Sequence, residues 1–213
     1  VRIALDGSPA GRPLDASLAA PGSRPAPVDV QPDWPFNVIY SSGTTGTPKG
    51  IVQSHEMRWR HVALAGAFGY APGCVTLLST PLYSNTTLVS FLPTVAAGGT
   101  VVLMAKFDVE AYLRIAQSER ATHTMLVPVQ YQRLMAHPSF DAFDLSSFRM
   151  KFCTSAPFHA ALKPDVLARW PGGLVEFYGM TEGGGGCMLL AHENPDKLHT
   201  VGRPMDGHDV RLL

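Results

Sequence analysis

Short apolar runs alternate with longer amphipathic stretches along most of the chain from Phe36 onward. Short runs rich in Val, Leu and Phe are typical of buried strands, and longer stretches with an apolar stripe are typical of helices that cover a sheet. We expect strands at 37–41, 75–79, 100–104, 122–127, 150–154 and 174–178, with helices at 54–68, 87–97, 109–119, 128–136 and 160–170. This alternation predicts an α/β fold.

Two of the predicted helices begin after a residue that can cap them. Ser54 precedes the first helix and Asp108 the third. An oxygen of either side chain can accept a hydrogen bond from an otherwise unpaired amide of the first turn. We therefore expect both residues to act as N-caps.

The first 35 residues have a different pattern from the rest. Residues 7–35 are crowded with Pro, Gly, Ala, Ser and Asp, which interrupt both the helical and the strand period. We interpret residues 1–35 as a connector and residues 36–213 as the main domain.

Composition narrows the class of protein. The 213 residues are 46% hydrophobic and 16% charged, with 17 basic and 17 acidic side chains. A chain of this size and hydrophobicity can bury a core, and its balanced charge gives no general attraction for nucleic acid or anionic membranes. No apolar run approaches the roughly 20 residues of a membrane helix, and the N-terminus lacks the pattern of a signal peptide. We expect a soluble protein of the cytoplasm that has no nucleic-acid partner.

The three cysteines, Cys74, Cys153 and Cys187, lie far apart and have no CxxC spacing. This spacing gives little support to a disulfide framework or a zinc site. We expect buried, reduced thiols.

One loop carries the strongest chemical signal. Residues 39–51 follow a predicted strand and combine glycines, hydroxyls and a lysine. Glycines let backbone amides turn inward, hydroxyls add donors, and an ammonium adds positive charge, so the loop is suited to a polyphosphate. It does not match the Walker pattern, because Pro48 precedes Lys49 and Gly50 follows it. A polar hairpin connection without a ligand is the structural alternative. The candidate phosphate-binding residues are Ser41, Ser42, Gly43, Thr44, Thr45, Gly46 and Lys49.

This loop resembles the phosphate-loop signature of the adenylate-forming superfamily, which includes acyl-CoA synthetases, peptide-synthetase adenylation domains and luciferases. Three further motifs follow in the family's order. Residues 177–182 (FYGMTE) resemble its adenine and magnesium motif, 154–157 (TSAP) a turn beside the adenine, and 201–204 (VGRP) the stretch before its ribose-binding aspartate. The resemblance implies a mixed β-sheet flanked by helices, forming one subdomain of the family's layered αβαβα large domain.

The resemblance also implies an activity. Members of the family activate a carboxylic acid with ATP, release pyrophosphate, and pass the acyl group of the adenylate to a thiol, commonly that of CoA. ATP or AMP, Mg²⁺ and the co-substrate CoA are therefore the implied ligands, and fatty acid metabolism is one implied setting. Positioning and charge stabilisation, without a covalent enzyme intermediate, would lower the barrier.

Residue roles follow from the matched motifs. Lys49, Thr181 and Glu182 are the implied catalytic residues, with Glu182 as the Mg²⁺ ligand and Thr181 as a donor to the α-phosphate. Tyr178 would stack on adenine, and Glu176 would accept from its amino group. The remaining implied nucleotide-binding residues are Ser155, Ala156, Pro157, Phe177, Gly179 and Met180. Taken singly, Glu182 is better explained as a solvated carboxylate and Tyr178 as a core aromatic residue at the end of a strand, whereas the joint pattern of motifs favours the functional interpretation.

The acid-binding pocket departs from the family pattern. The family has a histidine after a proline, a hydrophobic and an aromatic residue, whereas Ser84 stands at that position here. The glycine run at 183–186 is either a pocket wall or a turn after a strand. We assign Tyr83, Ser84, Val127, Tyr131 and Gly184 to the pocket, although a packed helix and strand would give the same sequence pattern.

The family's ribose-binding aspartate, hinge and lysine-bearing C-terminal domain have no counterpart up to Leu213. We therefore expect the chain to be the central part of a longer acyl-CoA synthetase and to be inactive alone. Two alternatives remain. The segment is a non-catalytic module that binds a nucleotide or a partner, or it belongs to an adenylation domain that loads a carrier protein.

Overall fold

The computed structural model describes residues 3–4, 7–41, 47–183 and 186–211. The chain forms two compact units, Val1–Gln31 and Pro32–Leu213. The described part of the first unit contains a parallel pair of two-residue strands, β1 (Ile3–Ala4) and β2 (Arg12–Pro13), and the 3-10 helix η1 (Asp15–Ser17). The predicted boundary between the connector and the main domain, after residue 35, stays a prediction.

A seven-stranded mixed sheet forms the centre of the second unit. Its strand order is β11-β10-β9-β8-β7-β5-β6. Neighbours from β6 to β9 are parallel, whereas β10 pairs antiparallel with both β9 and β11. The strands are β5 (Val75–Leu78), β6 (Thr100–Leu103), β7 (His123–Leu126), β8 (Met150–Cys153), β9 (Gly173–Gly179), β10 (Gly186–Leu190) and β11 (Arg203–Pro204).

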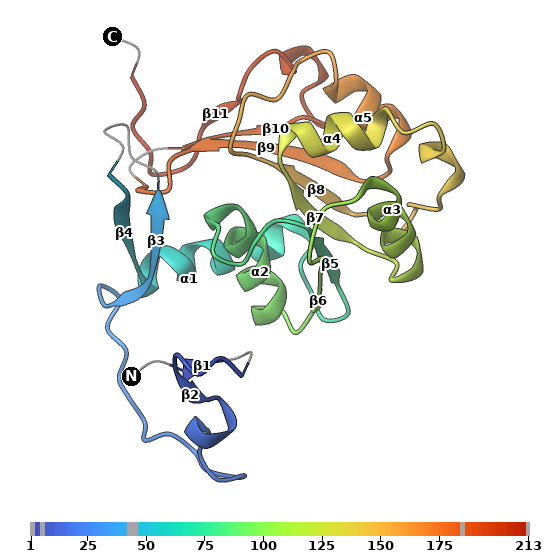
Figure 1. Cartoon of the computed structure of the whole chain (residues 1–213). Helices are drawn as coiled ribbons and strands as arrows, with labels where there is room; N and C mark the ends of the chain where they lie inside the picture. Colours follow the sequence, from blue (N-terminus) through green and yellow to red (C-terminus); the bar gives the residue numbers. More distant parts are fainter. Residues whose placement is uncertain (1–2, 5–6, 42–46, 184–185, 212–213) are drawn as a thin grey trace. The chain divides into compact units, whose positions relative to one another are not determined.

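A separate antiparallel hairpin precedes this sheet in the chain. It consists of β3 (Pro35–Ser41) and β4 (Lys49–Ser54). The glycine-rich loop joins the two strands in the sequence, and β4 leads directly into the first helix of the unit (Figure 1).

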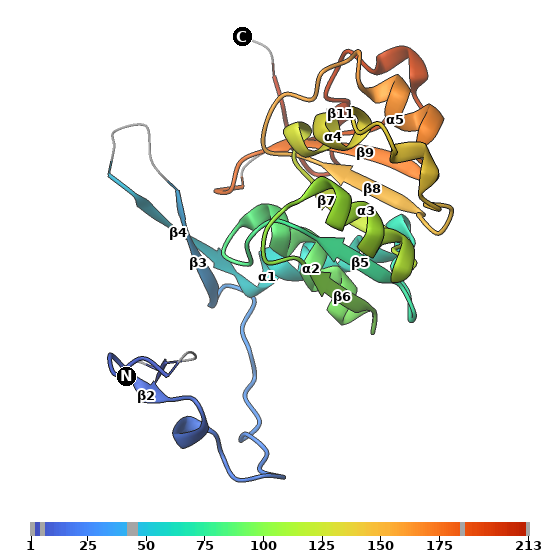
Figure 2. The same cartoon turned by 45° about the vertical axis from the view of Figure 1, so that its right-hand side comes forward.

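The helices cover both faces of the sheet. The α-helices are α1 (His55–Ala63), α2 (Asn85–Ala96), α3 (Val109–Ser118), α4 (Pro128–Met135) and α5 (Lys163–Arg169), and the 3-10 helices are η2 (Ala65–Phe68), η3 (Phe140–Ala142) and η4 (Pro195–Lys197). Figures 1 and 2 show α3, α4 and α5 on one side of the sheet, with α1 and α2 on the other.

Alternating strand residues build one core on each face, because successive side chains of a strand point to opposite sides. Leu126 and Cys153 pack in the core under α3, α4 and α5. Met125 and Phe152, one position earlier on the same strands, pack in the core beneath η2 and α2. The parallel strands are thus buried on both faces, as the near-continuous apolar runs indicate.

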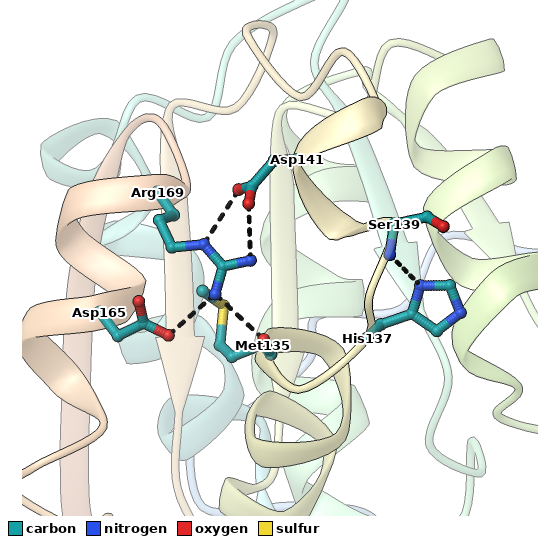
Figure 3. A network of polar contacts seen from close by, with 6 residues as sticks. All are labelled: Met135, His137, Ser139, Asp141, Asp165 and Arg169. Atoms are coloured by element: carbon teal, nitrogen blue, oxygen red, sulfur yellow. Dashed lines mark hydrogen bonds and ion pairs between the residues drawn. The ribbon is translucent and has the colours of Figure 1, made fainter.

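An ionic network fastens the outer helices on the α3–α5 side (Figure 3). The Arg169 guanidinium at the end of α5 binds both carboxylate oxygens of Asp141, at 2.9 and 3.0 Å, and one oxygen of Asp165 at 3.1 Å. It also donates to the Met135 carbonyl at the end of α4, over 3.0 Å. In the same view, the Ser139 amide donates to His137 Nδ1. One arginine therefore joins α5, α4 and η3.

The structure confirms the α/β fold, and every predicted strand and helix has a counterpart. Ser54 Oγ accepts from the Met57 amide and Asp108 Oδ1 from the Ala111 amide, so both predicted N-caps are present. The first predicted helix is divided into α1 and η2 at Leu64. Strands β4 and β10 were missed, because each begins next to glycines that weaken the strand pattern.

The three cysteines are free and buried, as predicted. Burial, followed by the nearby Glu176 carboxylate, raises the pKa of the Cys153 thiol. A thiol with a raised pKa is a poor nucleophile. Within the described ranges, no helix has the length and apolar character that a membrane span requires.

Candidate active site

The hairpin sets the position of the candidate phosphate-binding lysine. Ser41 and Lys49 face each other as the last pair of the β3–β4 ladder. The side chain of Lys49 is exposed. The five candidate residues between them, Ser42, Gly43, Thr44, Thr45 and Gly46, lie outside the described residues.

The FYGMTE motif lies at the carboxyl end of β9. Tyr178 and Met180 are 60% and 65% exposed, and Glu182 is also exposed. Residues 180–183 form a turn in which the Gly183 amide donates to the Met180 carbonyl over 3.1 Å. Most of the predicted nucleotide-binding side chains of this motif are therefore accessible to a ligand, as open α/β sheets place their ligands at the carboxyl ends of strands.

Glu176 requires a correction. It is only 3% exposed, and its carboxylate forms a buried ion pair with Lys163 on α5. The Lys163 ammonium also donates to the carbonyls of Leu198 (2.8 Å) and Thr200 (3.1 Å), so three oxygen atoms surround its charge. The predicted role of Glu176 as an adenine acceptor is wrong in this structure, because the carboxylate is enclosed and already paired. Sequence spacing alone does not reveal a partner on another helix.

The TSAP motif follows the neighbouring strand β8, so the two motifs lie side by side. The Thr154 hydroxyl donates to the Phe177 carbonyl over 3.0 Å. Ser155 has a φ of 80°, a left-handed conformation that costs a residue with a side chain on the order of 1 kcal/mol or more. Ser155, Ala156 and Pro157 are exposed beside the FYGMTE turn.

The predicted acid pocket is largely misplaced. Tyr131 is fully buried on the α3–α5 side, where its hydroxyl donates to the Phe152 carbonyl over 2.9 Å and its ring packs against Trp170. Val127 is the N-cap residue of α4 and does not line the groove described below. Tyr83 is 81% exposed and Ser84 is the N-cap residue of α2, but neither lines the groove described below. Gly184 lies outside the described residues. An aromatic residue on a helix gives the same sequence pattern whether it faces a core or a pocket.

A large groove on the other side of the sheet contains both motifs. Its volume is about 1630 Å³. This exceeds the roughly 300–1,000 Å³ of a typical small-molecule site, so it has room for a nucleotide and a second substrate. The motif residues Thr154, Ser155, Tyr178, Thr181 and Glu182 line one part of it. Side chains from α1, η2 and α2 that the sequence did not single out line another part, namely Met57, His61, Leu64, Phe68, Thr86 and Val89.

Buried polar groups surround this groove. Arg58 is 3% exposed and donates to the side-chain oxygens of Asn37 (3.0 Å) and Asn85 (2.8 Å), and burial lowers its pKa to about 10. Burial and the Arg58 charge lower the pKa of His61 to about 4. The His61 imidazole on the groove wall is therefore neutral at pH 7.

The Glu182 carboxylate suits a magnesium ion that binds together with the phosphates of a substrate. Within the described ranges, no group of three or more His, Cys, Asp or Glu side chains converges on one point. Mg²⁺ commonly keeps several waters and uses one or two carboxylates together with substrate phosphates. The exposed Glu182 supplies one such carboxylate beside the groove.

The fourth motif has a structural explanation. Gly202 has a φ of 84°, and a Cβ atom there would lie 1.9 Å from the Met188 carbonyl oxygen. Only glycine fits this approach of the VGRP segment to β10.

Comparison with known protein families shows which family the chain belongs to. The family model described as "AMP-binding enzyme" matches residues 1–213. This chain belongs to the AMP-binding enzyme family. Membership confirms the resemblance drawn from the motifs.

Individual relatives agree with the family match. A feruloyl-CoA synthase from an Amycolatopsis species is 36% identical over 202 residues, which cover 90% of this chain and 40% of the synthase. The amide bond synthetase McbA from Marinactinospora thermotolerans has a TM-score of 0.81 and 31% identity, covering 96% of this chain and 41% of McbA. An o-succinylbenzoate CoA synthetase from Bacillus subtilis, in complex with ATP and magnesium ion, has a TM-score of 0.72 and 25% identity. The match covers 83% of this chain and 37% of that synthetase. This AMP-binding chain spans less than half the length of each.

Proposed function

We propose that the protein containing this chain uses ATP to convert a carboxylic acid to an acyl-adenylate, and then transfers the acyl group to the CoA thiol with release of AMP. The observation that carries the proposal is a contact between two segments that bear motifs, one of which lines the groove. The hairpin that bears Lys49 contacts the turn that bears Thr181 and Glu182, through a hydrogen bond from Gln53 to the Thr181 carbonyl.

In the proposed reaction, the acid's carboxylate attacks the α-phosphorus of ATP, and pyrophosphate leaves with the electrons of the broken P–O bond. Lys49 binds the departing phosphates, which gain negative charge as that bond breaks. Thr181 holds the α-phosphate by a hydrogen bond. Both residues lower the barrier by placing charge and donors where charge develops.

Glu182 is proposed to bind the magnesium ion, which when bound neutralises phosphate charge. Its exposed carboxylate and the absence of a preformed cluster in the described part of the chain suit an ion that is completed by phosphate oxygens. The Bacillus subtilis relative was solved in complex with ATP and magnesium ion, which supports a site that takes the two together.

We propose that adenine lies between Tyr178 and the strand-end segment Ser155 to Pro157. Tyr178 offers an exposed aromatic face, and Thr154 holds the two segments together through the Phe177 carbonyl. With Glu176 committed to Lys163, recognition of the adenine amino group falls to backbone groups of these segments.

We propose an acid with an apolar body as the substrate. The part of the groove formed by α1, η2 and α2 is lined by Leu64, Phe68 and Val89, with Phe152 from the sheet. Its histidine, His61, is neutral at pH 7, so this wall does not favour a second negative charge. The ferulate of the feruloyl-CoA synthase is an acid of this kind.

Acid-dependent exchange of labelled pyrophosphate into ATP tests the proposal. The full-length protein is assayed with a panel of aromatic, aliphatic and dicarboxylic acids, and exchange is expected with apolar acids. Absence of exchange with every acid would contradict the proposal and favour a non-catalytic nucleotide-binding module. Separate assays with CoA, a carrier protein or an amine identify the acceptor, since the McbA relative is an amide bond synthetase.

A further inference from the structure

Gln53 joins the hairpin to the turn that follows β9. Its side-chain Nε2 donates to the Thr181 carbonyl over 2.8 Å, across 128 residues of sequence. Gln53 is 1% exposed, and its Oε1 atom has no hydrogen-bond partner in the described ranges. A buried amide with an unpaired oxygen is costly, so its presence at this position calls for an explanation.

Gln53 and Lys49 project from the same face of β4. Residues 49, 51 and 53 share one side of the strand, because side chains alternate with a period of two. Ile51 and Gln53 on this side are buried, whereas Val52 on the other side is 58% exposed. The Lys49 side chain therefore leaves the strand on the face that meets Thr181. A strand rises about 3.4 Å per residue, which separates the backbones of Lys49 and Gln53 by about 14 Å.

The hydrogen bond from Gln53 also fixes the central peptide of the turn. In the turn at 180–183, Thr181 and Glu182 occupy the two central positions, and Glu182 has a negative φ while Gly183 has a φ of 82°. Rotation of the peptide between Thr181 and Glu182 would produce a type II turn, which requires a positive φ at Glu182. A donor bound to the Thr181 carbonyl opposes that rotation.

We propose that Gln53 is a positioning residue that fixes both the orientation of the Thr181–Glu182 peptide and its distance from Lys49. This inference rests on the proposed function, in which those three residues bind the phosphates and the metal ion. Gln53 does not touch the substrates in this account. It acts through the backbone of Thr181.

The test compares Gln53→Leu with Gln130→Leu in the full-length protein. Gln130 is a matched control because it is also a buried amide, 6% exposed, but its Nε2 donates to Ser79 Oγ near α4. Pyrophosphate exchange is measured while ATP, acid and Mg²⁺ are varied separately. Gln53→Leu is expected to raise the KM for ATP and the half-saturating Mg²⁺ concentration about three- to tenfold, the effect of one lost hydrogen bond. The KM for the acid should change less than twofold, and Gln130→Leu should change neither the KM for ATP nor the Mg²⁺ requirement.

A conservative replacement provides a second arm. Gln53→Met keeps the length of the side chain but removes the donor, so it should impair ATP and Mg²⁺ use as strongly as Gln53→Leu. Unchanged ATP and Mg²⁺ dependence in folded Gln53→Leu protein, together with an active wild type, would overturn the positioning role while leaving the proposed function intact.

Hydrogen exchange of the ligand-free protein tests the positioning independently of activity. Gln53→Leu should speed amide exchange at Gly183, whose amide closes the turn, whereas Gln130→Leu should not. Equal exchange at Gly183 in wild type and Gln53→Leu would contradict the inference even if the wild type shows no pyrophosphate exchange.

Discussion

Two regions around strands β8 and β9 differ in how their polar groups are satisfied. In the first, which we call the closed region, Lys151 and Lys163 are buried and each ammonium lies close to three oxygen atoms. Lys151 donates to the carbonyls of Trp170, Pro171 and Gly172 at 2.7–3.0 Å. Lys163 binds Glu176 and two carbonyls.

In the second, which we call the open region, residues 154–157 and 178–183 lie at the carboxyl ends of the same strands. Tyr178 and Met180 are mostly exposed, and Ser155 holds a strained backbone conformation. Backbone strain of this kind persists at functional sites when contacts with the surrounding structure hold the residue in place. The comparison indicates that the buried lysines serve stability, whereas the strand ends are kept available for a ligand.

The largest expected effect is in the closed region. Lys163→Met should destabilise the protein by about 3–5 kcal/mol, because it leaves the Glu176 carboxylate buried without a partner. Urea unfolding measures the change. The double variant Lys163→Met/Glu176→Met should recover much of the loss. A cost below about 1 kcal/mol for the single variant would show that the closed region does not depend on this pair.

In the open region, and at Lys49 on the hairpin, we expect large effects on activity and small effects on stability. Lys49→Ala and Glu182→Ala should each reduce pyrophosphate exchange at least tenfold, since each removes charge stabilisation of about 1.4 kcal/mol or more. Both side chains are exposed, so the free energy of unfolding should change by no more than about 0.5 kcal/mol. Wild-type exchange rates in both variants would argue against these assignments.

A histidine on the groove wall should make stability depend on pH. The folded-state pKa of His61, about 4, lies below the usual value of 6.5, so below pH 6.5 the unfolded chain binds the proton more readily. The contribution of neutral His61 to the free energy of unfolding is fully present above about pH 6.5 and is lost as the pH falls toward 4. Between pH 7 and 5 we expect a loss of about 1 kcal/mol, allowing for partial exposure. His61→Gln should reduce this pH dependence in urea unfolding, and an identical dependence in the variant would exclude His61 as its source.

The smallest expected effect comes from backbone strain at Ser155. Ser155→Gly should raise the free energy of unfolding by about 0.5–1 kcal/mol, because glycine adopts positive φ without a Cβ clash. The change removes the exposed hydrogen bond to Thr86, which offsets part of the gain. Arg120→Gly, at a φ of 49° away from the groove, is the matched control. A loss of stability specific to Ser155→Gly would mean that the contact with Thr86 outweighs the strain.

Much of the fold was predictable because apolar periodicity reports burial directly. The parallel strands and their helices followed from it, as did the two N-caps at Ser54 and Asp108. Strands β4 and β10 did not, because neighbouring glycines obscure the period. The motifs identified the family and the open region.

The errors in the candidate site concern the direction and partners of side chains. Tyr131 and Glu176 have residue types suited to a pocket, but Tyr131 faces the core and Glu176 meets a lysine from α5. Gln53 and His61 were missed for the converse reason. Their importance depends on contacts made by the folded chain, and neither belongs to a recognisable motif.

Hydrogen exchange with and without ATP and Mg²⁺ tests the central claim most directly, because it compares the open and closed regions in one measurement on the full-length protein. The account predicts slower exchange on nucleotide addition at residues 154–157 and 177–183, with little change at α4 on the opposite side of the sheet. Protection confined to other segments, or no change at 177–183 at saturating nucleotide, would contradict the assignment of the open region as the nucleotide site.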